Sequence, residues 1–356
     1  MILTIIVLII YSIIFLIGAI GNCIVLLIIY YEKKPRKSTN IFIMNLAFAD
    51  LIFIITCIPE SGANLFDYTL IPLSLCKYQM FFTYISIFAS AYTLVLLALD
   101  RLVAVVYPLR AVSIRTHKNS TFACIFIWII SFLMFTLTLV ASRRYDNEVK
   151  ENKGNKTIHC FDVNKIFLLT EAKLNIPQLY FSFNILSYII PLLAIITMYT
   201  IILNFLRKIN NKELKTAVNK QWRRKITKTI WLVIATFAIC WFPQNIRLFY
   251  IGLTYPNNYV IKENLSRVHY IVLTVISQIM SYFNYCINPI LYCLMLKKYR
   301  WYLNRSIICI RSYFSRQSPE VKGEKKLSIM KPYRSSLDIS RKNSSKSLKS
   351  INPVNV

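Results

Sequence analysis

Glycine and acidic residues are both scarce in this chain. Only 6 of its 356 residues are glycine, and no Gly-rich phosphate-binding loop of a common motif is present. Asp and Glu together number 15, against 43 Lys and Arg. The apolar stretches contain no paired carboxylates for acid–base catalysis and no Cys/His spacing typical of a metal site. These absences make an enzyme the least favoured class of protein.

An internal repeat, which marks many transporters, is also missing. A transporter or channel would need polar residues that run continuously through the bilayer. Here the polar positions inside apolar stretches cluster around Asp50 and near the two ends of the stretches. A transporter or channel is therefore the weaker alternative to a membrane protein that carries a signal. A flux assay run beside a nucleotide-exchange assay separates these two classes.

What the chain has in abundance is apolar sequence. Hydrophobic residues make up 56% of it, more than a soluble protein can cover with polar groups. Seven stretches are each long enough to cross a bilayer core of about 30 Å as a helix. The sequence therefore predicts an all-α membrane protein with a bundle of seven transmembrane helices. The predicted spans are approximately 2–30, 40–59, 78–106, 121–141, 177–206, 229–253 and 268–296.

The basic residues are distributed unevenly around these spans. Most Lys and Arg lie in alternate connections, at 31–38, 107–119 and 207–228, and beyond residue 296. By the positive-inside rule, these segments and the C-terminus face the cytoplasm and the N-terminus lies outside. Membrane topology thus accounts for the formal net charge of +28 without a nucleic-acid partner. We expect a multi-pass protein of the plasma membrane.

Two domains are expected. Residues 1–310 form the membrane domain, which ends in a short basic amphipathic helix over 297–310 along the inner leaflet. Residues 311–356 form a Ser/Lys-rich cytoplasmic tail that is expected to be disordered. Cys309, at the end of the amphipathic segment, is a candidate for palmitoylation.

The predicted outer side carries candidate modification sites. Asn155 and Asn264 each begin an Asn-X-Ser/Thr glycosylation sequon. Cys76 and Cys160 both face the oxidising exterior, so a disulfide between them is a hypothesis. Two free thiols are the alternative.

Asp50 lies near the middle of the second span. An ionised side chain at that depth costs several kcal/mol unless it is paired or hydrated, so it predicts a functional site. A structural anchor between helices is the alternative. Both interpretations need polar partners, and Asn22, Ser90, Asn284 and Asn288 are the candidates in apolar surroundings.

The fifth, sixth and seventh spans each have a proline in their interior. Pro191 and Pro243 each remove a backbone hydrogen bond and are expected to kink their helices. Trp241 stands two residues before Pro243, where a large aromatic side chain beside a hinge is placed to sense a ligand. Pro289 interrupts the last span directly after Asn288.

Taken in order, these motifs resemble those of the rhodopsin-like (class A) G-protein-coupled receptors, over nearly the whole chain to about residue 310. The resemblance rests on the following residues: Gly21-Asn22, Leu46-Ala47-Phe48-Ala49-Asp50, Cys76, Asp100-Arg101, Trp128, Cys160, Pro191 with Tyr199, Cys240-Trp241-Phe242-Pro243 and Asn288-Pro289-Ile290-Leu291-Tyr292. It implies that the chain activates heterotrimeric G proteins by a conformational change and is not an enzyme. Arrestin and receptor kinases are implied as partners of the tail.

The resemblance also implies roles for single residues. Trp241 would be the switch beneath the ligand, and Arg101 would engage the G protein. Asp50 would hold a sodium ion or a proton together with Asn22, Ser90, Asn284 and Asn288. Tyr285 departs from the pattern because it replaces a small polar residue of that pocket. The residues implied in coupling and activation are Asp100, Arg101, Tyr199, Pro243, Asn288, Pro289 and Tyr292.

Within the family, three segments are most similar to galanin and allatostatin-A receptors: 90–96, 105–108 and 281–289. Somatostatin-type and opioid-type receptors are the alternative. Thr83 stands where amine receptors carry an aspartate, and Tyr282 where opsins carry a lysine, so the resemblance favours a neuropeptide. Glu60 is placed to face a basic group of the ligand, although pairing with a neighbouring Arg or Lys is equally open. The candidate ligand-binding residues are Glu60, Thr83, Tyr84, Ile87, Trp241, Gln244, Asn245, Arg247, Leu248, Gln278 and Tyr282.

Overall fold

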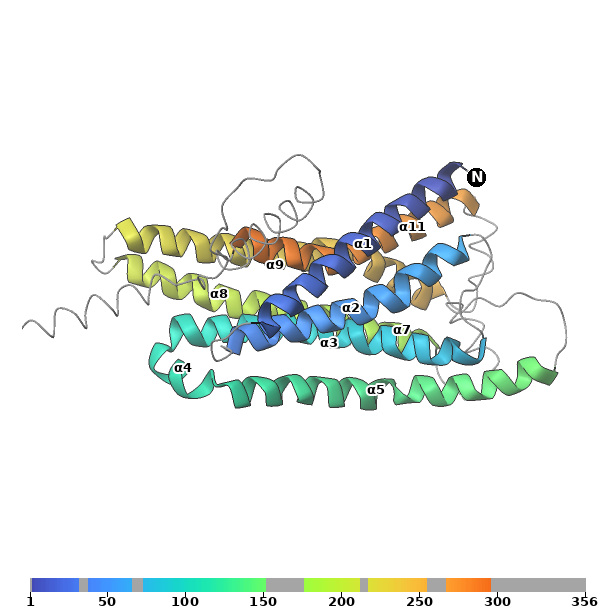
Figure 1. Cartoon of the computed structure of the whole chain (residues 1–356), viewed down its shortest axis with the longest axis horizontal. Helices are drawn as coiled ribbons and strands as arrows, with labels where there is room; N and C mark the ends of the chain where they lie inside the picture. Colours follow the sequence, from blue (N-terminus) through green and yellow to red (C-terminus); the bar gives the residue numbers. More distant parts are fainter. Residues whose placement is uncertain are drawn as a thin grey trace, which may run out of the picture. The chain divides into compact units, whose positions relative to one another are not determined.

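All regular secondary structure in the described residues is helical. A computed structural model describes residues 2–31, 38–65, 73–151, 176–211, 217–254 and 267–295. Figure 1 shows the helices in sequence colours. They are α1 (Ile2–Tyr30), α2 (Ser38–Asn64), α3 (Leu73–Val106), α4 (Pro108–Ile114), α5 (His117–Glu151), α7 (Ile176–Asn184), the π-helix η1 (Ile185–Ile189), α8 (Ile190–Asn211), α9 (Ala217–Thr254) and α11 (Arg267–Met295).

Every predicted span coincides with described helix. Five described helical segments are long and apolar enough to cross a membrane, so the chain is a multi-pass membrane protein. The segments are Ile2–Tyr30, Ser38–Ala63, Tyr78–Val106, His117–Thr136 and Tyr180–Lys208. The predicted eighth helix over 297–310 and the tail lie outside the described residues.

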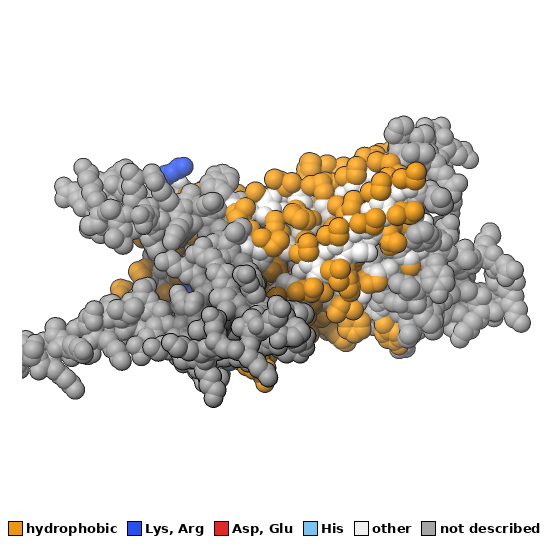
Figure 2. All heavy atoms as spheres, turned by 45° about the horizontal axis from the view of Figure 1, so that its top comes forward, with side chains coloured by type: hydrophobic (Ala, Val, Ile, Leu, Met, Phe, Trp, Pro, Cys, Tyr) orange, Lys and Arg blue, Asp and Glu red, His pale blue; other side chains and the backbone are white. Residues whose placement is uncertain are grey.

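The outer faces of these helices are apolar. Figure 2 shows hydrophobic side chains gathered over one face of the described helices, with few charged atoms among them. On α1 the exposed large hydrophobic residues recur through the whole helix, from Ile2 to Leu27. A surface of this kind is stable against lipid and unstable against water.

Helix α1 approaches its neighbours closely at two glycines. A Cβ atom at Gly18 would lie 2.7 Å from Ile54 Cδ1 of α2 and 3.3 Å from Cys286 Cβ of α11. One at Gly21 would lie 3.0 Å from the ring of Pro289. Small residues let helix backbones approach in a membrane, where packing replaces the hydrophobic effect. The Gly21-Asn22 motif therefore has a packing role beside any polar one.

Proline shapes two helices in different ways. The five-residue π-helix η1 directly precedes Pro191, which is the second residue of α8. Because Pro191 has no N–H to donate, the preceding turn widens to a π-turn. The kink expected at Pro191 stays a prediction. By contrast, α2 continues through Pro59 for five residues beyond the predicted end of that span.

The sequence did not predict α4. This seven-residue helix follows the third span, begins at Pro108 and ends at Ile114. Proline is favoured at the first position of a helix because its missing N–H would have no partner there. That signal was present in the sequence and was overlooked.

Candidate functional site

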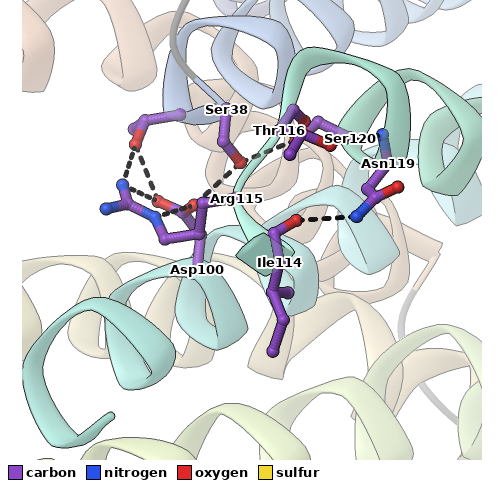
Figure 3. Close-up of polar contacts among 8 residues, drawn as sticks. Ser38, Asp100, Ile114, Arg115, Thr116, Asn119 and Ser120 are labelled. Atoms are coloured by element: carbon purple, nitrogen blue, oxygen red, sulfur yellow. Dashed lines mark hydrogen bonds and ion pairs between the residues drawn. The ribbon is translucent and has the colours of Figure 1, made fainter. Parts of the chain in front are cut away.

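A cluster of polar side chains fixes the ends of α2, α3 and α5 around Asp100 (Figure 3). Arg115 Nε donates to Asp100 Oδ1 at 2.7 Å, and Arg115 Nη2 donates to Oδ2 at 3.0 Å. Ser38 Oγ donates to Oδ1 at 2.9 Å and Thr39 Oγ1 donates to Oδ2 at 2.7 Å. The carboxylate is 1% exposed, so these four donors take the place of its water.

The cluster extends from Ser38 of α2 to the start of α5. Ser120 Oγ, at the start of α5, donates to Ser38 Oγ at 2.7 Å. Asn119 Nδ2 donates to the carbonyl oxygen of Ile114 at 3.0 Å and closes the turn after α4. The resemblance implied Asp100 and Arg101 together in coupling and activation. The structure places Arg115, which was not singled out from the sequence, on Asp100, while Arg101 is half-buried.

Beside this cluster, α4 exposes an apolar face. Leu109 is 90% exposed and Val112, one turn later, is 82% exposed. Ala111, on the other side, is buried. Residues three apart lie on the same helical face, so Leu109 and Val112 form a small apolar surface next to Asp100.

Asp50 is completely buried and has two of the expected partners. Ser90 Oγ donates to Oδ1 at 2.8 Å, and Asn288 Nδ2 donates to Oδ2 at 2.8 Å. Asn22 has a different role, because its amide donates to the carbonyl oxygens of Gly18 and Tyr285, at 2.9 and 3.0 Å. Asn284 is buried on the same helix as Asn288.

A second polar link crosses the bundle at Trp128. Its Nε1 donates to Asn45 Oδ1 at 2.8 Å, and Asn45 Nδ2 donates to Thr93 Oγ1 at 2.7 Å. Trp128 also meets the ring of Phe48 edge-on, with centroids 5.7 Å apart. These contacts connect α5, α2 and α3, and they explain why an indole is needed at residue 128.

Five aromatic rings form a continuous row through four helices. Tyr11 of α1 meets Tyr282 at 5.4 Å between centroids, and Tyr282 meets Phe53 of α2 at 5.7 Å. Phe53 is stacked on Tyr285 at 3.8 Å, and Tyr285 meets Trp241 of α9 edge-on at 6.0 Å. We call these five residues the aromatic row; it joins the predicted switch, Trp241, to α1, α2 and α11.

Polar groups lie beside Tyr11 and Tyr282 of the aromatic row. Tyr11 Oη donates to Gln278 Oε1 at 2.8 Å, and Tyr282 Oη shares a hydrogen bond of 2.7 Å with Ser61 Oγ. Glu60, the residue before Ser61, is 1% exposed. Two of the predicted ligand residues, Gln278 and Tyr282, therefore each form a hydrogen bond at this part of the row.

A third helix contributes to this region. Gln79 Nε2 of α3 donates to the carbonyl oxygen of Thr56 at 2.6 Å, and Thr83 Oγ1 donates to Thr56 Oγ1 at 3.0 Å. Gln79 Oε1 is buried and accepts no hydrogen bond within the described part of the chain. Gln79 was not singled out from the sequence, and a buried acceptor of this kind is a place for a ligand donor.

The other predicted ligand residues of α9 follow Trp241 along the helix: Gln244, Asn245, Arg247 and Leu248. Asn245 is buried and donates from Nδ2 to the Trp241 carbonyl oxygen at 2.8 Å. Arg247 Nε donates to Gln244 Oε1 at 3.3 Å, and Leu248 is half-buried. Pro243 lies inside this helix, so Trp241 and Asn245 flank the hinge.

Two predicted ligand residues have packing neighbours instead of polar ones. Tyr84 is stacked on Phe135 of α5 at 5.7 Å and meets Phe183 of α7 edge-on at 5.4 Å. Ile87 is buried on α3. Tyr199, predicted for activation, is buried on α8, and Tyr292 is half-buried near the end of α11.

Several predicted sites cannot be placed. Cys160, Asn155, Asn264 and Cys309 lie outside the described residues, and Cys76 lies on α3 without a described side chain. The disulfide, the two glycosylation sites and the palmitoylation site stay predictions. Within the described residues, no three or more His, Cys, Asp or Glu side chains are grouped so that they could hold a metal ion.

Comparison with known proteins identifies a family. Residues 21–292 match the profile described as 7 transmembrane receptor (rhodopsin family). The chain is 31% identical to the galanin-like G-protein coupled receptor npr-9 of Caenorhabditis elegans, over 82% of this chain and 70% of that protein. It is also 31% identical to the allatostatin-A receptor of Bombyx mori, over 84% and 78%. Identity to the human galanin receptor type 2 is 29%, over 82% and 70%.

Proposed function

The chain belongs to the rhodopsin family of seven-transmembrane receptors, and from this membership we propose that it is a G-protein-coupled receptor for an extracellular neuropeptide of the galanin or allatostatin-A type. The observation that carries the proposal is that two receptors of these names align over 82% and 84% of this chain. The family profile matches residues 21–292, a range that contains Asp50, Glu60, Asp100 and Trp241. Somatostatin-type and opioid-type ligands are the alternative within the same family.

The polar composition around the aromatic row supports a peptide ligand. Gln79 Oε1 is a buried acceptor with no partner among the described residues, and it lies in the same network as Thr83. Glu60 adds a buried carboxylate on the neighbouring helix. Peptide N–H groups and an amidated terminus are donors, so they complement these acceptors.

Activation is proposed to be a population shift without covalent chemistry. A ligand that contacts Asn245 or Trp241 favours a conformation in which α9 pivots at Pro243, because that residue already lacks one backbone hydrogen bond. The pivot separates the cytoplasmic end of α9 from its neighbours and uncovers Arg101. The heterotrimeric G protein binds the opened cleft.

The exposed apolar face of α4 supports a second contact with the G protein. Leu109 and Val112 are among the most exposed large hydrophobic residues of the described chain. On a cytoplasmic connection such a face is costly in water, and burial against a partner recovers about 1.5–3 kcal/mol for a leucine. The Arg115–Asp100 pair holds α4 against the end of α3 and so presents this face.

A sodium ion at Asp50 remains part of the proposal. The oxygens that fit it are the buried carboxylate, Ser90 Oγ and Asn22 Oδ1, which is buried without a partner in the described residues. A bound cation would neutralise the Asp50 charge. Tyr285 stands beside this set where the family has a small polar residue, which leaves less room for an ion.

Topology and further partners complete the proposal. Seven transmembrane helices, a short eighth helix along the inner leaflet, an outer N-terminus and a cytoplasmic C-terminus are supported by the charge distribution. Arrestin and receptor kinases are proposed as partners of the serine-rich tail, on the family resemblance.

A ligand screen tests the proposal. Cells expressing the full chain are exposed to galanin, allatostatin-A, somatostatin and opioid peptides, and G-protein activation is recorded beside an ion-flux assay. We expect activation by an allatostatin-A or galanin peptide that is lost in Arg101→Ala at equal surface expression. A response only to somatostatin or opioid peptides selects the alternative, and ligand-driven flux without nucleotide exchange contradicts the receptor proposal.

A further inference from the structure

Tyr285 is the central member of the aromatic row and touches three other helices. Its ring is stacked on Phe53 of α2, with the planes 14° apart, and meets Trp241 of α9 at 74°. Its carbonyl oxygen accepts from Asn22 of α1 at 3.0 Å. Any movement of Trp241 therefore changes the packing of a residue that is also held by α1 and α2.

The hydroxyl of Tyr285 is the anomaly in this arrangement. The residue is 0% exposed, and its Oη has no hydrogen-bond partner among the described residues. Tyrosine carries its hydroxyl into a protein interior almost only where a partner accepts or donates. A buried hydroxyl that no protein group pairs contributes less than a paired one, so it makes the conformation in which it is found less stable.

Tyr282, one turn earlier on the same helix, shows the contrast. It too is buried in the aromatic row, but its Oη is 2.7 Å from Ser61 Oγ and 3.6 Å from Cys57 Sγ. Both tyrosines are buried in the aromatic row, but only the hydroxyl of Tyr282 has a hydrogen-bond partner among the described residues. They provide an internal comparison.

We propose that Tyr285 is a conformational switch: its unsatisfied hydroxyl biases the bundle away from the packing described here, and it finds a partner when Trp241 and the hinge of α9 move. The ring transmits the movement because it is packed between Phe53 and Trp241. This proposal concerns the equilibrium between two conformations and deepens the proposed receptor function. Its first two measurements need neither a ligand nor a G protein.

The test compares Tyr285→Phe with Tyr282→Phe in the purified full chain, in lipid nanodiscs and in choline chloride so that no sodium ion can bind. Both changes keep the ring and remove one oxygen. Unfolding is followed with a thiol-reactive dye, since Cys57, Cys124, Cys240 and Cys286 are buried and free. We expect Tyr285→Phe to raise Tm by about 2–8 °C, because it removes an unpaired hydroxyl. Tyr282→Phe should lower Tm, because it removes the hydrogen bond to Ser61.

Hydrogen exchange supplies a readout that a simple gain in stability would not produce. In Tyr285→Phe the amides flanking Trp241 on α9 should open about 5- to 150-fold less often, with little change on α5. If Tm is unchanged or falls, or if protection rises equally in every helix, the switch is refuted.

The last measurement rests on the proposed function. Agonist-independent nucleotide exchange on a panel of Gα subunits should fall at least about 5-fold in Tyr285→Phe, because the activating pivot moves Trp241 away from the ring. If Tm rises and the amides around Trp241 are protected from hydrogen exchange, but nucleotide exchange on Gα is unchanged, this movement does not activate the G protein. A wild-type chain that activates no Gα would refute the receptor proposal and leave the first two measurements intact.

Discussion

Arg115 donates to both carboxylate oxygens of Asp100, at 2.7 and 3.0 Å, although the two residues lie on opposite sides of the turn that contains α4. A guanidinium and a carboxylate that meet through two parallel bonds have a fixed mutual orientation. The pair therefore sets the angle at which α4 leaves α3. Because Arg101 is the next residue after Asp100, the same pair restrains the residue implied in G-protein binding.

Replacing Arg115 with Ala should release this restraint. Asp100 would keep Ser38 and Thr39 as donors, and Arg115 is 27% exposed, so we expect a loss of only about 1–2 kcal/mol in stability. We further expect higher agonist-independent nucleotide exchange, because Arg101 is freer to move. Arg110→Ala, which removes an exposed arginine from the same helix, is the matched control. Identical exchange in the two variants would show that the pair has no such role.

This pair also shows the limit of the sequence prediction. The apolar stretches located every described long helix, because spans in lipid need only length and low polarity. Arg115 reaches Asp100 because of the path that the chain takes through the short helix α4. The pattern of apolar residues does not predict that path. Likewise Ser90 and Asn288 were correctly predicted beside Asp50, whereas Asn22 donates to backbone carbonyls. Which of several buried amides meets a carboxylate is decided by helix rotation, and sequence alone does not give it.

At the predicted ligand site, the sequence again gives residues without their neighbours. Gln278 and Tyr282 each form a hydrogen bond beside the aromatic row, and Glu60 is buried. Tyr84, a predicted ligand contact, is stacked on Phe135 and meets Phe183 edge-on. Thr83, also a predicted contact, donates to Thr56. Because the direction of a side chain on a helix changes by about 100° per position, these two adjacent residues have different neighbours, and the sequence does not give which.

The link through Trp128 gives a stability prediction. Trp128→Phe keeps a ring beside Phe48 but removes the donor to Asn45, and we expect a cost of about 1–2 kcal/mol with a lower Tm. A double-mutant cycle with Asn45→Ala isolates the hydrogen bond. Their coupling should reach at least about 0.5 kcal/mol. Strict additivity would mean that the bond contributes nothing measurable.

The apolar face of α4 gives a coupling prediction. Leu109 is 90% exposed, so Leu109→Asp should leave the Tm unchanged while it lowers the maximal rate of agonist-stimulated nucleotide exchange about 10-fold or more. Leu109→Met keeps an apolar side chain of similar size and should retain the exchange rate. If Leu109→Asp couples as well as Leu109→Met, the face does not contact the G protein.

Sodium gives a prediction with a salt control. If the ion binds at Asp50, replacing choline chloride with sodium chloride at constant ionic strength should raise the Tm of the wild-type chain, and Asp50→Asn should abolish the rise. Ser131→Ala, which removes a buried hydroxyl that is bonded within α5 and is not among the residues implied to hold the ion, should preserve it. A Tm that does not respond to sodium would show that Tyr285 and the two donors to Asp50 leave no site for the ion.

Glu60 gives a prediction about the ligand itself. Glu60→Gln keeps the shape of a side chain that is 1% exposed and removes only its charge. If Glu60 reads a basic group, the potency of a peptide that carries one should fall about 10- to 150-fold. A peptide analogue with uncharged citrulline in place of the basic residue should be equally potent on the wild-type chain and on Glu60→Gln, because it has no positive charge for Glu60 to bind. If Glu60 is instead paired with an Arg or Lys of this chain, the potency of both peptides on Glu60→Gln should fall by the same factor, and the Tm of this variant should fall as well.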